Sequence, residues 1–247
     1  MSNAIGNPPR CVFALGAALV GLISIMSASA HAEARSIEGV WRLSAPQSLL
    51  SPADGKPIPF TAKGRRQYDA NRRAADKGDY SFDLSKTRCG SPGQPRLMLT
   101  PRPFAIFARP RMVTVFYEWN RLFRQISVGE PLINPVIGED WWKFGVMQGR
   151  SRAEWKGDVL EVRTVGFAEN LLDDVTPSSD KLKLTERLRL RDAGMLEDRI
   201  TITDPEMFTR PWDVVLTYTR QSDELFPFKE HVCLDGLKLE EDRVEKR

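Results

Sequence analysis

The chain has 247 residues, of which 41% are hydrophobic and 28% are charged, and its formal net charge is +3. This length and apolar content suit a folded domain with a full core, and the nearly balanced charges give no reason to expect nucleic acid as a partner. Only two histidines are present, and there is no phosphate-binding glycine loop or haem-attachment motif, so we expect neither a metal nor another cofactor.

The N-terminal segment has the pattern of a secretory signal peptide. A weakly basic start that ends at Arg10 is followed by an apolar run from Cys11 to Met26 and by small-residue cleavage sites. The run is short for a membrane span; an uncleaved anchor is the alternative, and membrane association is expected only through this segment. The pattern predicts a periplasmic or otherwise exported protein with a signal peptide at 1–32, a β-barrel domain at 33–236 and a charged tail at 237–247.

The first part of the mature chain predicts a strand, a loop and a helix. Ile37 to Ser44 has the character of an opening strand, and residues 48–60 are rich in Ser, Pro, Asp and Gly, as loops are. Thr61 can cap a helix that runs to about Asp76, which has few apolar residues and is therefore expected on the surface, over the barrel. Residues 83–103 predict a Pro- and Gly-rich ordered loop with a short strand at 96–99.

The middle of the chain predicts a meander and a hairpin. Short strands are expected at 104–108, 112–118 and 121–128, and in the third strand the alternation places Arg124 on an apolar face with Leu122 and Ile126. The aromatic cluster at 141–144 suits either a lid over an aromatic ligand or ordinary core packing. Strands at 146–155 and 158–167 follow, joined by a Lys-Gly turn.

The most informative stretch is the predicted β-hairpin at 181–204. Its first strand alternates leucines with charged residues, and its second strand repeats the pattern after the turn Asp192-Ala193-Gly194. Each apolar face carries one acid, Glu186 in the first strand and Asp198 in the second. A carboxylate that points into an apolar interior is costly unless it is paired or used, so these two acids are candidate functional residues.

Two further strands are expected, at 213–220 and 226–232. The count is then about nine or ten strands and one main helix, with regular hairpin spacing and no alternation of strands with helices. This pattern favours a mainly β fold, a single antiparallel β-barrel that closes on itself, with one surface helix.

Several motifs carry a resemblance to known proteins. Gly39-Val40-Trp41 resembles the Gly-x-Trp start of lipocalin-like, or calycin, barrels. Nearly the whole mature chain resembles a family of exported bacterial proteins, through Arg88-Cys89 with Pro92-Gly93-Gln94-Pro95, Phe123-Arg124-Gln125-Ile126, Trp155 to Phe167, Thr185-Glu186-Arg187, and Asp204-Pro205 with Pro211-Trp212. The resemblance implies a calycin-like barrel and supplies no catalytic residues. Where the family often has Gly-His-Ser, this chain has Gly149-Arg150-Ser151.

Two cysteines stay in the chain after the signal segment is removed. Cys89 and Cys233 would reach an oxidising compartment, and we predict that they form a disulfide. Two separate buried thiols are the alternative, because the distance between the residues cannot be derived from sequence.

The acids, the arginine and the tyrosines together predict a polar pocket inside the barrel. Our first hypothesis is an exported barrel that binds a small hydrophobic or aromatic molecule and acts on it as a cofactor-independent acid–base lyase, with C–C cleavage and aldehyde release, or as an isomerase. A lignin-derived aromatic compound would suit such a site. The expected catalytic residues are Glu186, Arg124 and Asp198, and the expected ligand-binding residues are Tyr117, Trp119, Trp142, Tyr218 and Arg150.

Two other interpretations are open. The barrel can be a carrier or sensor of the same ligand class without chemistry, in which the buried charges only orient the ligand. The three charged residues can also form a buried salt-bridge network that only specifies the barrel.

Overall fold

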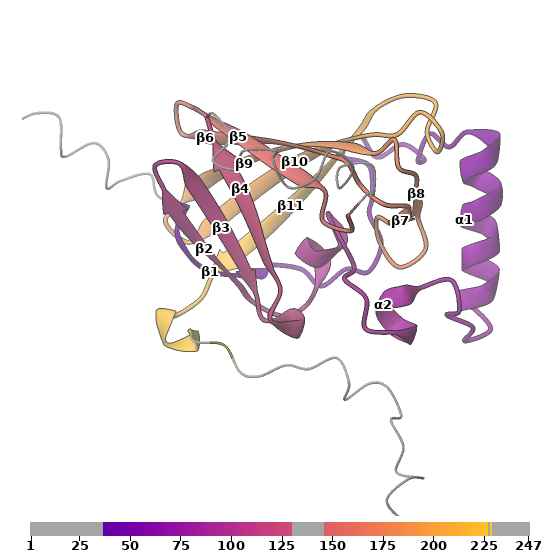
Figure 1. Ribbon diagram of the computed structural model, residues 1–247, viewed down its shortest axis with the longest axis horizontal. Helices are drawn as coiled ribbons and strands as arrows, with labels where there is room; N and C mark the ends of the chain where they lie inside the picture. Colours follow the sequence, from indigo (N-terminus) through magenta and orange to yellow (C-terminus); the bar gives the residue numbers. More distant parts are fainter. Residues whose placement is uncertain (1–36, 130–145, 227, 229–247) are drawn as a thin grey trace, which may run out of the picture. The chain divides into compact units, whose positions relative to one another are not determined.

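A closed β-barrel dominates the computed structural model, which describes residues 37–129, 146–226 and 228 (Figure 1). Nine strands of this described part follow one another around the wall in the order β1-β11-β10-β9-β6-β5-β4-β3-β2. The predicted mainly β barrel is therefore confirmed. The predicted signal peptide and charged tail lie outside the described residues, and so does Cys233, so the disulfide stays a prediction.

The barrel strands are β1 (Gly39–Leu43), β2 (Phe104–Arg109), β3 (Met112–Tyr117), β4 (Phe123–Val128), β5 (Arg150–Lys156), β6 (Val159–Val165), β9 (Lys183–Asp192), β10 (Met195–Thr203) and β11 (Trp212–Arg220). A small second sheet pairs β7 (Asn170–Leu171) with β8 (Pro177–Ser178).

One pair of neighbours in the wall is parallel. Ile126 of β4 lies beside Ser151 of β5, and Val128 lies beside Ala153, with both strands running the same way. The prediction of a purely antiparallel barrel is wrong at this position. Parallel neighbours need a long crossover instead of a tight turn, and the connection over residues 129–149 is long enough to provide one.

The hairpin β9–β10 has the predicted register. Glu186 lies opposite Ile200, and Leu188 lies opposite Asp198, so both acids point to the same side as the apolar residues. That side is the interior: Leu182, Leu184, Leu188, Leu196, Ile200 and Ile202 are all buried. The alternation therefore identified the inward face correctly, because a shift of one residue would have buried the arginines instead.

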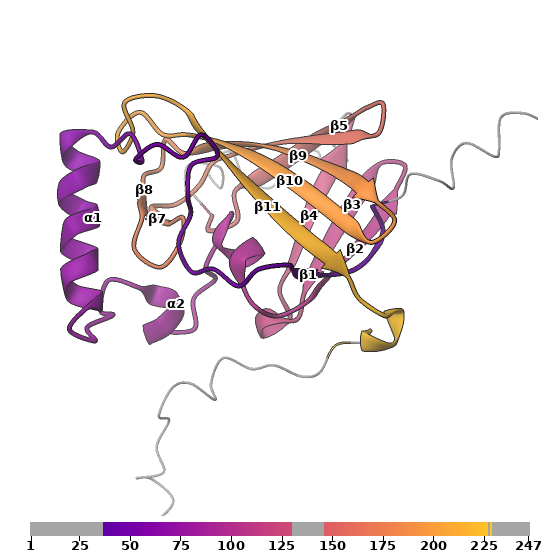
Figure 2. The ribbon, with the colours of Figure 1, turned by 180° about the vertical axis from the view of Figure 1, so that it is seen from behind.

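Helix α1 (Ala62–Ala75) begins at the predicted cap, where the Thr61 hydroxyl accepts a hydrogen bond from Gly64 N at 3.0 Å. The helix stands beyond one end of the barrel, beside β8, and does not cover the wall as expected (Figures 1 and 2). Its anchor is Asn71, whose amide donates to Val175 O at 2.9 Å. The helix has little apolar surface to bury, so a polar contact to a loop holds it instead.

The predicted short strand at 96–99 is instead the 3₁₀ helix η2 (Arg96–Leu99), which follows the one-turn helix α2 (Leu84–Thr87). Leu97 N and Met98 N donate to carbonyls at Gly93 and Pro95, so this segment satisfies its backbone locally and needs no neighbouring strand. All residues of η2 are buried, and η2 lies at the end of the barrel that faces α2 (Figure 1).

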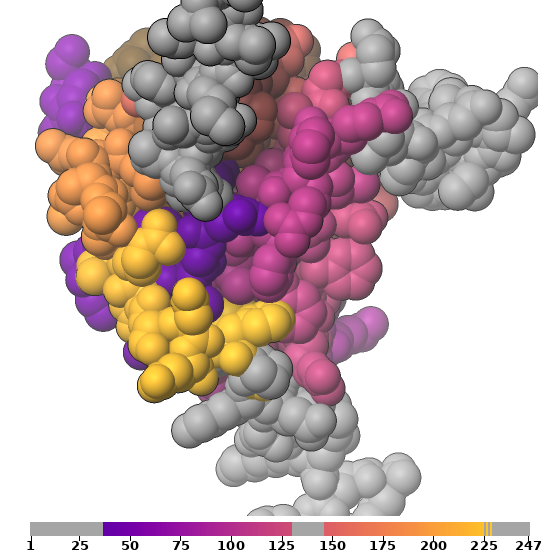
Figure 3. Space-filling model, turned by 90° about the vertical axis from the view of Figure 1, so that its left-hand side faces the viewer, coloured from indigo at the N-terminus to yellow at the C-terminus, as the bar shows by residue number. Residues whose placement is uncertain are grey.

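At the C-terminal side, the 3₁₀ turn η5 (Asp223–Leu225) follows β11 and contacts β1 (Figure 3). The ring of Phe226 then lies 5.4 Å from that of Phe107 on the outside of β2. Most of the strand predicted at 226–232 lies outside the described residues. No helix in the described part of the chain has the length and apolar character needed to cross a bilayer.

Candidate functional site

Arg124 and Glu186 form an ion pair inside the barrel. Arg124 Nη1 donates to Glu186 Oε1 at 2.8 Å, Nη2 donates to Oε2, and the side chains are 4% and 1% exposed. Arg124 also donates to the hydroxyls of Ser151 and Thr164, at 3.0 and 2.8 Å. Consecutive strands β4, β5, β6 and β9 therefore each contribute one polar side chain to a band across the interior. A bidentate pair of this kind holds both charges firmly.

Asp198 lies next to this pair on β10 and is fully buried. Neither of its carboxyl oxygens has a hydrogen-bond partner of acceptable geometry among the described residues. Burial raises the pKa of Asp198 well above its usual value, and the negative charge of Glu186 raises it further. Burial therefore favours the protonated form of Asp198.

Two tyrosines, Tyr117 and Tyr218, lie in the same interior as Arg124, Glu186 and Asp198. These five residues are here called the interior polar cluster. Tyr117 Oη accepts from Gln94 Nε2 at 2.8 Å and donates to Met98 Sδ at 3.3 Å, whereas Tyr218 Oη has no partner in the described part of the chain. The ring of Phe104 lies between them, 6.0 Å from Tyr117 and 5.0 Å from Tyr218. Burial raises the pKa of Tyr117 to about 12 and raises that of Tyr218 as well, so both phenols are neutral donors.

The structure brings the three predicted catalytic residues together, but their chemical capacities differ. Both carboxylate oxygens of Glu186 accept hydrogen bonds from Arg124 and are therefore already engaged. Asp198 and Tyr218 keep unused hydrogen-bonding capacity. The interior polar cluster thus consists of the Arg124–Glu186 ion pair, Tyr117, and the unpartnered groups of Asp198 and Tyr218, and its roles stay predictions.

The predicted ligand-binding residues are dispersed. Tyr117 and Tyr218 point into the barrel, whereas Arg150 begins β5 opposite the outward-facing Val165 and so points to the outer face. Trp142 lies outside the described residues. Trp119, in the 3₁₀ turn η3 (Trp119–Arg121) after β3, lies at a surface pocket that the sequence did not predict.

This pocket, here called the η2 pocket, has a volume of about 560 Å³. Its lining comes from five separate segments of the chain, and it consists of Gln47, Ser48, Ser85, Lys86, Pro92, Arg96, Leu99, Thr100, Pro101, Trp119 and Asp174. The predicted Pro- and Gly-rich loop at 83–103 supplies most of these residues. The sequence did not predict the pocket, because the pocket exists only where these segments meet.

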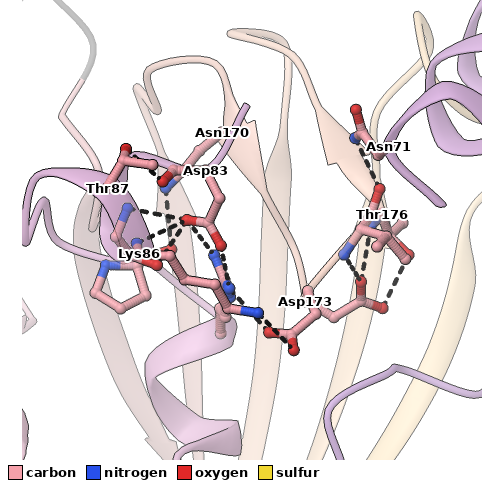
Figure 4. A network of polar contacts seen from close by, with 12 residues as sticks. Asn71, Asp83, Lys86, Thr87, Asn170, Asp173 and Thr176 are labelled. Atoms are coloured by element: carbon pink, nitrogen blue, oxygen red, sulfur yellow. Dashed lines mark hydrogen bonds and ion pairs between the residues drawn. The ribbon is translucent and has the colours of Figure 1, made fainter. Parts of the chain in front are cut away.

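Lys86, Arg96 and Asp174, which line the η2 pocket, belong to a network of polar contacts (Figure 4). Arg96 donates to Asp83 at 3.0 and 2.6 Å and to Asp174 Oδ1 at 2.8 Å, and Lys86 Nζ lies 3.2 Å from Asp174 Oδ2. Burial alone would raise the pKa of Asp83, but hydrogen bonds and the charge of Arg96 outweigh it and lower that pKa. Two cations thus face two carboxylates, and the wall is close to electrically neutral.

A neighbouring acid has a structural task. Asp173 is buried and accepts hydrogen bonds from Leu50 N, Val175 N, Thr176 N and Thr176 Oγ1 at 2.7 to 2.9 Å (Figure 4). These contacts fix the loop that carries Asp174. The described residues contain no group of three or more His, Cys, Asp or Glu side chains that could hold a metal ion.

Comparisons with known proteins add little to this description. No protein family matches the sequence, and no curated protein does. Among solved structures, the chain is similar to a point mutant of the fluorescent protein UnaG, with 14% identity, 75% of this chain and 96% of that chain covered, and a TM-score of 0.33. A similarity this remote carries no argument about function. The resemblance of the sequence motifs to exported bacterial proteins stays a prediction.

Proposed function

We propose that this protein binds a small, uncharged, largely apolar molecule with an aromatic group, and that the η2 pocket is its binding site. The pocket volume carries this proposal, since about 560 Å³ lies within the range of small-molecule sites. The pocket adjoins the end of a barrel whose interior carries a second, polar set of groups. Export through residues 1–32 is part of the same proposal.

The lining supports a neutral ligand. Lys86 and Arg96 are already paired with carboxylates, so a charged ligand would have to compete with these ion pairs. Trp119, Leu99 and Pro101 offer apolar and flat surfaces for a ring to lie against. These contacts favour a neutral aromatic compound over an aromatic acid.

The experiment compares two probes of the same shape, neutral 4-methoxyacetophenone and anionic 4-methoxybenzoate, by isothermal titration calorimetry. We expect the neutral probe to bind more tightly. Trp119→Ala should weaken its binding about tenfold or more, as truncation of an aromatic anchor does. Trp155→Ala is the matched control, because Trp155 lies on β5 outside the pocket and is 39% exposed. Equal effects of the two substitutions would refute the assignment of the pocket.

Acid–base catalysis, as a cofactor-independent lyase or isomerase, is the second candidate function. The observation that favours it is Asp198, a buried acid whose pKa is raised by burial and which lies beside the unpartnered Tyr218 hydroxyl. Incubation of the protein with a panel of neutral aromatic dimers, followed by mass spectrometry, tests it. A product that disappears in Asp198→Asn would support catalysis by this acid, and binding without any product would support a carrier.

A further inference from the structure

Asp198 and Tyr218 are buried polar residues whose hydrogen-bonding capacity the fold leaves unused. Both are 0% exposed, and neither the two carboxyl oxygens nor the phenol oxygen has a well-aligned hydrogen bond among the described residues, although the backbone N–H of Arg187 approaches the Asp198 carboxyl group. Leaving such groups unsatisfied destabilises a folded protein, so native structures contain few of them and each requires an explanation. Arg124, Glu186 and Tyr117 in the same interior all have partners, whereas Gln94 Oε1 and Trp212 Nε1 are further buried polar atoms without one among the described residues.

The two residues lie close together on neighbouring strands. In the register of β10 and β11, Asp198 is opposite Leu216 and Tyr218 is opposite Leu196, so Asp198 and Tyr218 are diagonal neighbours on the inward face. Diagonal neighbours in an antiparallel pair are within reach of long and aromatic side chains. Their polar groups can therefore serve the same bound atom.

The chemistry of the pair selects the ligand group. Burial raises the pKa of both residues and so favours their protonated forms, in which each offers an O–H donor. Two donors suit a hydrogen-bond acceptor without a proton of its own, such as a carbonyl oxygen. A carboxylate would meet the nearby negative charge of Glu186, which is an unfavourable contact in an apolar interior.

Packed side chains connect the η2 pocket to this pair. Leu99 lines the pocket, and Met98 in the same turn contacts Tyr117 Oη at 3.3 Å inside the barrel. The ring of Phe104 then lies 5.0 Å from Tyr218. Methionine is unbranched and adapts readily to different shapes, so Met98 is a side chain that a ligand can displace.

We propose that Asp198 and Tyr218 form an inner subsite that binds the carbonyl oxygen of a neutral aromatic ketone or aldehyde whose ring occupies the η2 end of the barrel. The proposal rests on the function proposed above. It also accounts for the unpartnered oxygens, which are satisfied when the carbonyl group is bound.

The test uses two matched probes, 4-methoxyacetophenone and 4-ethylanisole, in which the carbonyl group is replaced by a methylene. The intact protein should bind the ketone about tenfold more tightly by calorimetry, the value of one or two hydrogen bonds. Tyr218→Phe should remove most of this preference and leave the melting temperature unchanged or higher, because an unsatisfied hydroxyl is lost. Tyr117→Phe is the control: it loses a satisfied hydroxyl, so it should lower the melting temperature and keep the preference.

A second measurement uses the unmodified protein, so its result does not depend on whether the variants fold. The carbonyl stretch of ¹³C-labelled 4-methoxyacetophenone should move to lower frequency when the ketone is bound to the unmodified protein. Equal affinity for the two probes, or an unshifted carbonyl stretch, would overturn the inner subsite. If both probes bind equally and Trp119→Ala weakens both, the η2 pocket stands and only the inner subsite fails. If neither probe binds, both proposals fail.

Discussion

At the scale of single residues, Arg124 and Glu186 depend on each other. Each is buried, and each supplies the charge that the other needs in an apolar interior. A buried pair adds little net stability compared with apolar residues, but removal of one partner strands the other. We expect the pair to help fix the register of the four strands whose side chains it joins.

Glu186→Gln should therefore destabilise the protein by roughly 3–5 kcal/mol, because it leaves the Arg124 charge buried without a counter-ion. Glu161→Gln is the matched control on β6. Glu161 pairs with Lys156, Arg163 and Arg187, whose side chains are 43% to 65% exposed, so its loss should cost about 1 kcal/mol or less. Urea denaturation of both variants measures the difference. Similar losses for the two variants would place Glu186 in a solvated environment.

Asp198 should make stability depend on pH. Its pKa is raised in the folded state, so its contribution is fully present below the ordinary aspartate range and is lost as the pH rises towards the folded pKa. The ionisable side chains that face it are Glu186, Arg124 and Tyr218.

Asp198→Asn removes this titration and keeps the shape. The variant should gain stability relative to the parent protein as the pH rises from 4 to 8, by up to about 1.4 kcal/mol per pH unit in the range where the acid titrates only in the unfolded chain. Urea denaturation at each pH value gives the difference. A difference that does not change with pH would mean that Asp198 titrates normally.

At the scale of elements, the β9–β10 hairpin decides which side chains reach the interior. Its inward face is apolar except for the two acids, and its outward face carries arginines paired with Glu161 and Glu197. Arg187 and Arg199 lie directly opposite each other, which is unfavourable for like charges, but each has its own acidic partner.

Leu188→Asp should prevent folding, because the new carboxylate would be buried in the barrel core, where Leu188 is 4% exposed. Arg189→Asp, one residue along the same strand, should be mild, since the Arg189 side chain is 50% exposed and loses only a surface ion pair. Circular dichroism and thermal melting of the two variants test the register. Comparable effects of the two changes would contradict it.

The conformation of η2 could not be predicted from its local sequence. The sequence predicts a strand at residues 96–99 because the segment is apolar and lies between prolines. The segment instead satisfies its backbone within a single 3₁₀ turn, with Met98 in contact with Tyr117 in the interior and Arg96 paired with Asp83 and Asp174. A strand needs a free neighbour along the sheet, and the closed barrel offers none.

At the scale of the whole molecule, the two candidate sites lie at different depths. The η2 pocket is a neutral, partly aromatic surface site, and the interior polar cluster lies behind η2. The η2 pocket suits recognition of an aromatic ring, and the interior polar cluster suits recognition of a polar atom attached to that ring. This arrangement is the basis of both proposals made above.

The sequence by itself determined the local features of this protein. Period-two alternation identified the inward faces of the hairpin and of β4, and it placed Arg124, Glu186 and Asp198 inside. Thr61 gave the start of α1, since a cap depends only on residues three positions apart.

Only the tertiary structure decided which of these residues meet. Arg124 reaches Glu186 past β5 and β6, β4 and β5 pair in parallel, and five distant segments enclose the η2 pocket. The physical reason is that alternation fixes the direction of a side chain relative to its own strand, whereas its neighbours depend on the order in which the strands close the barrel.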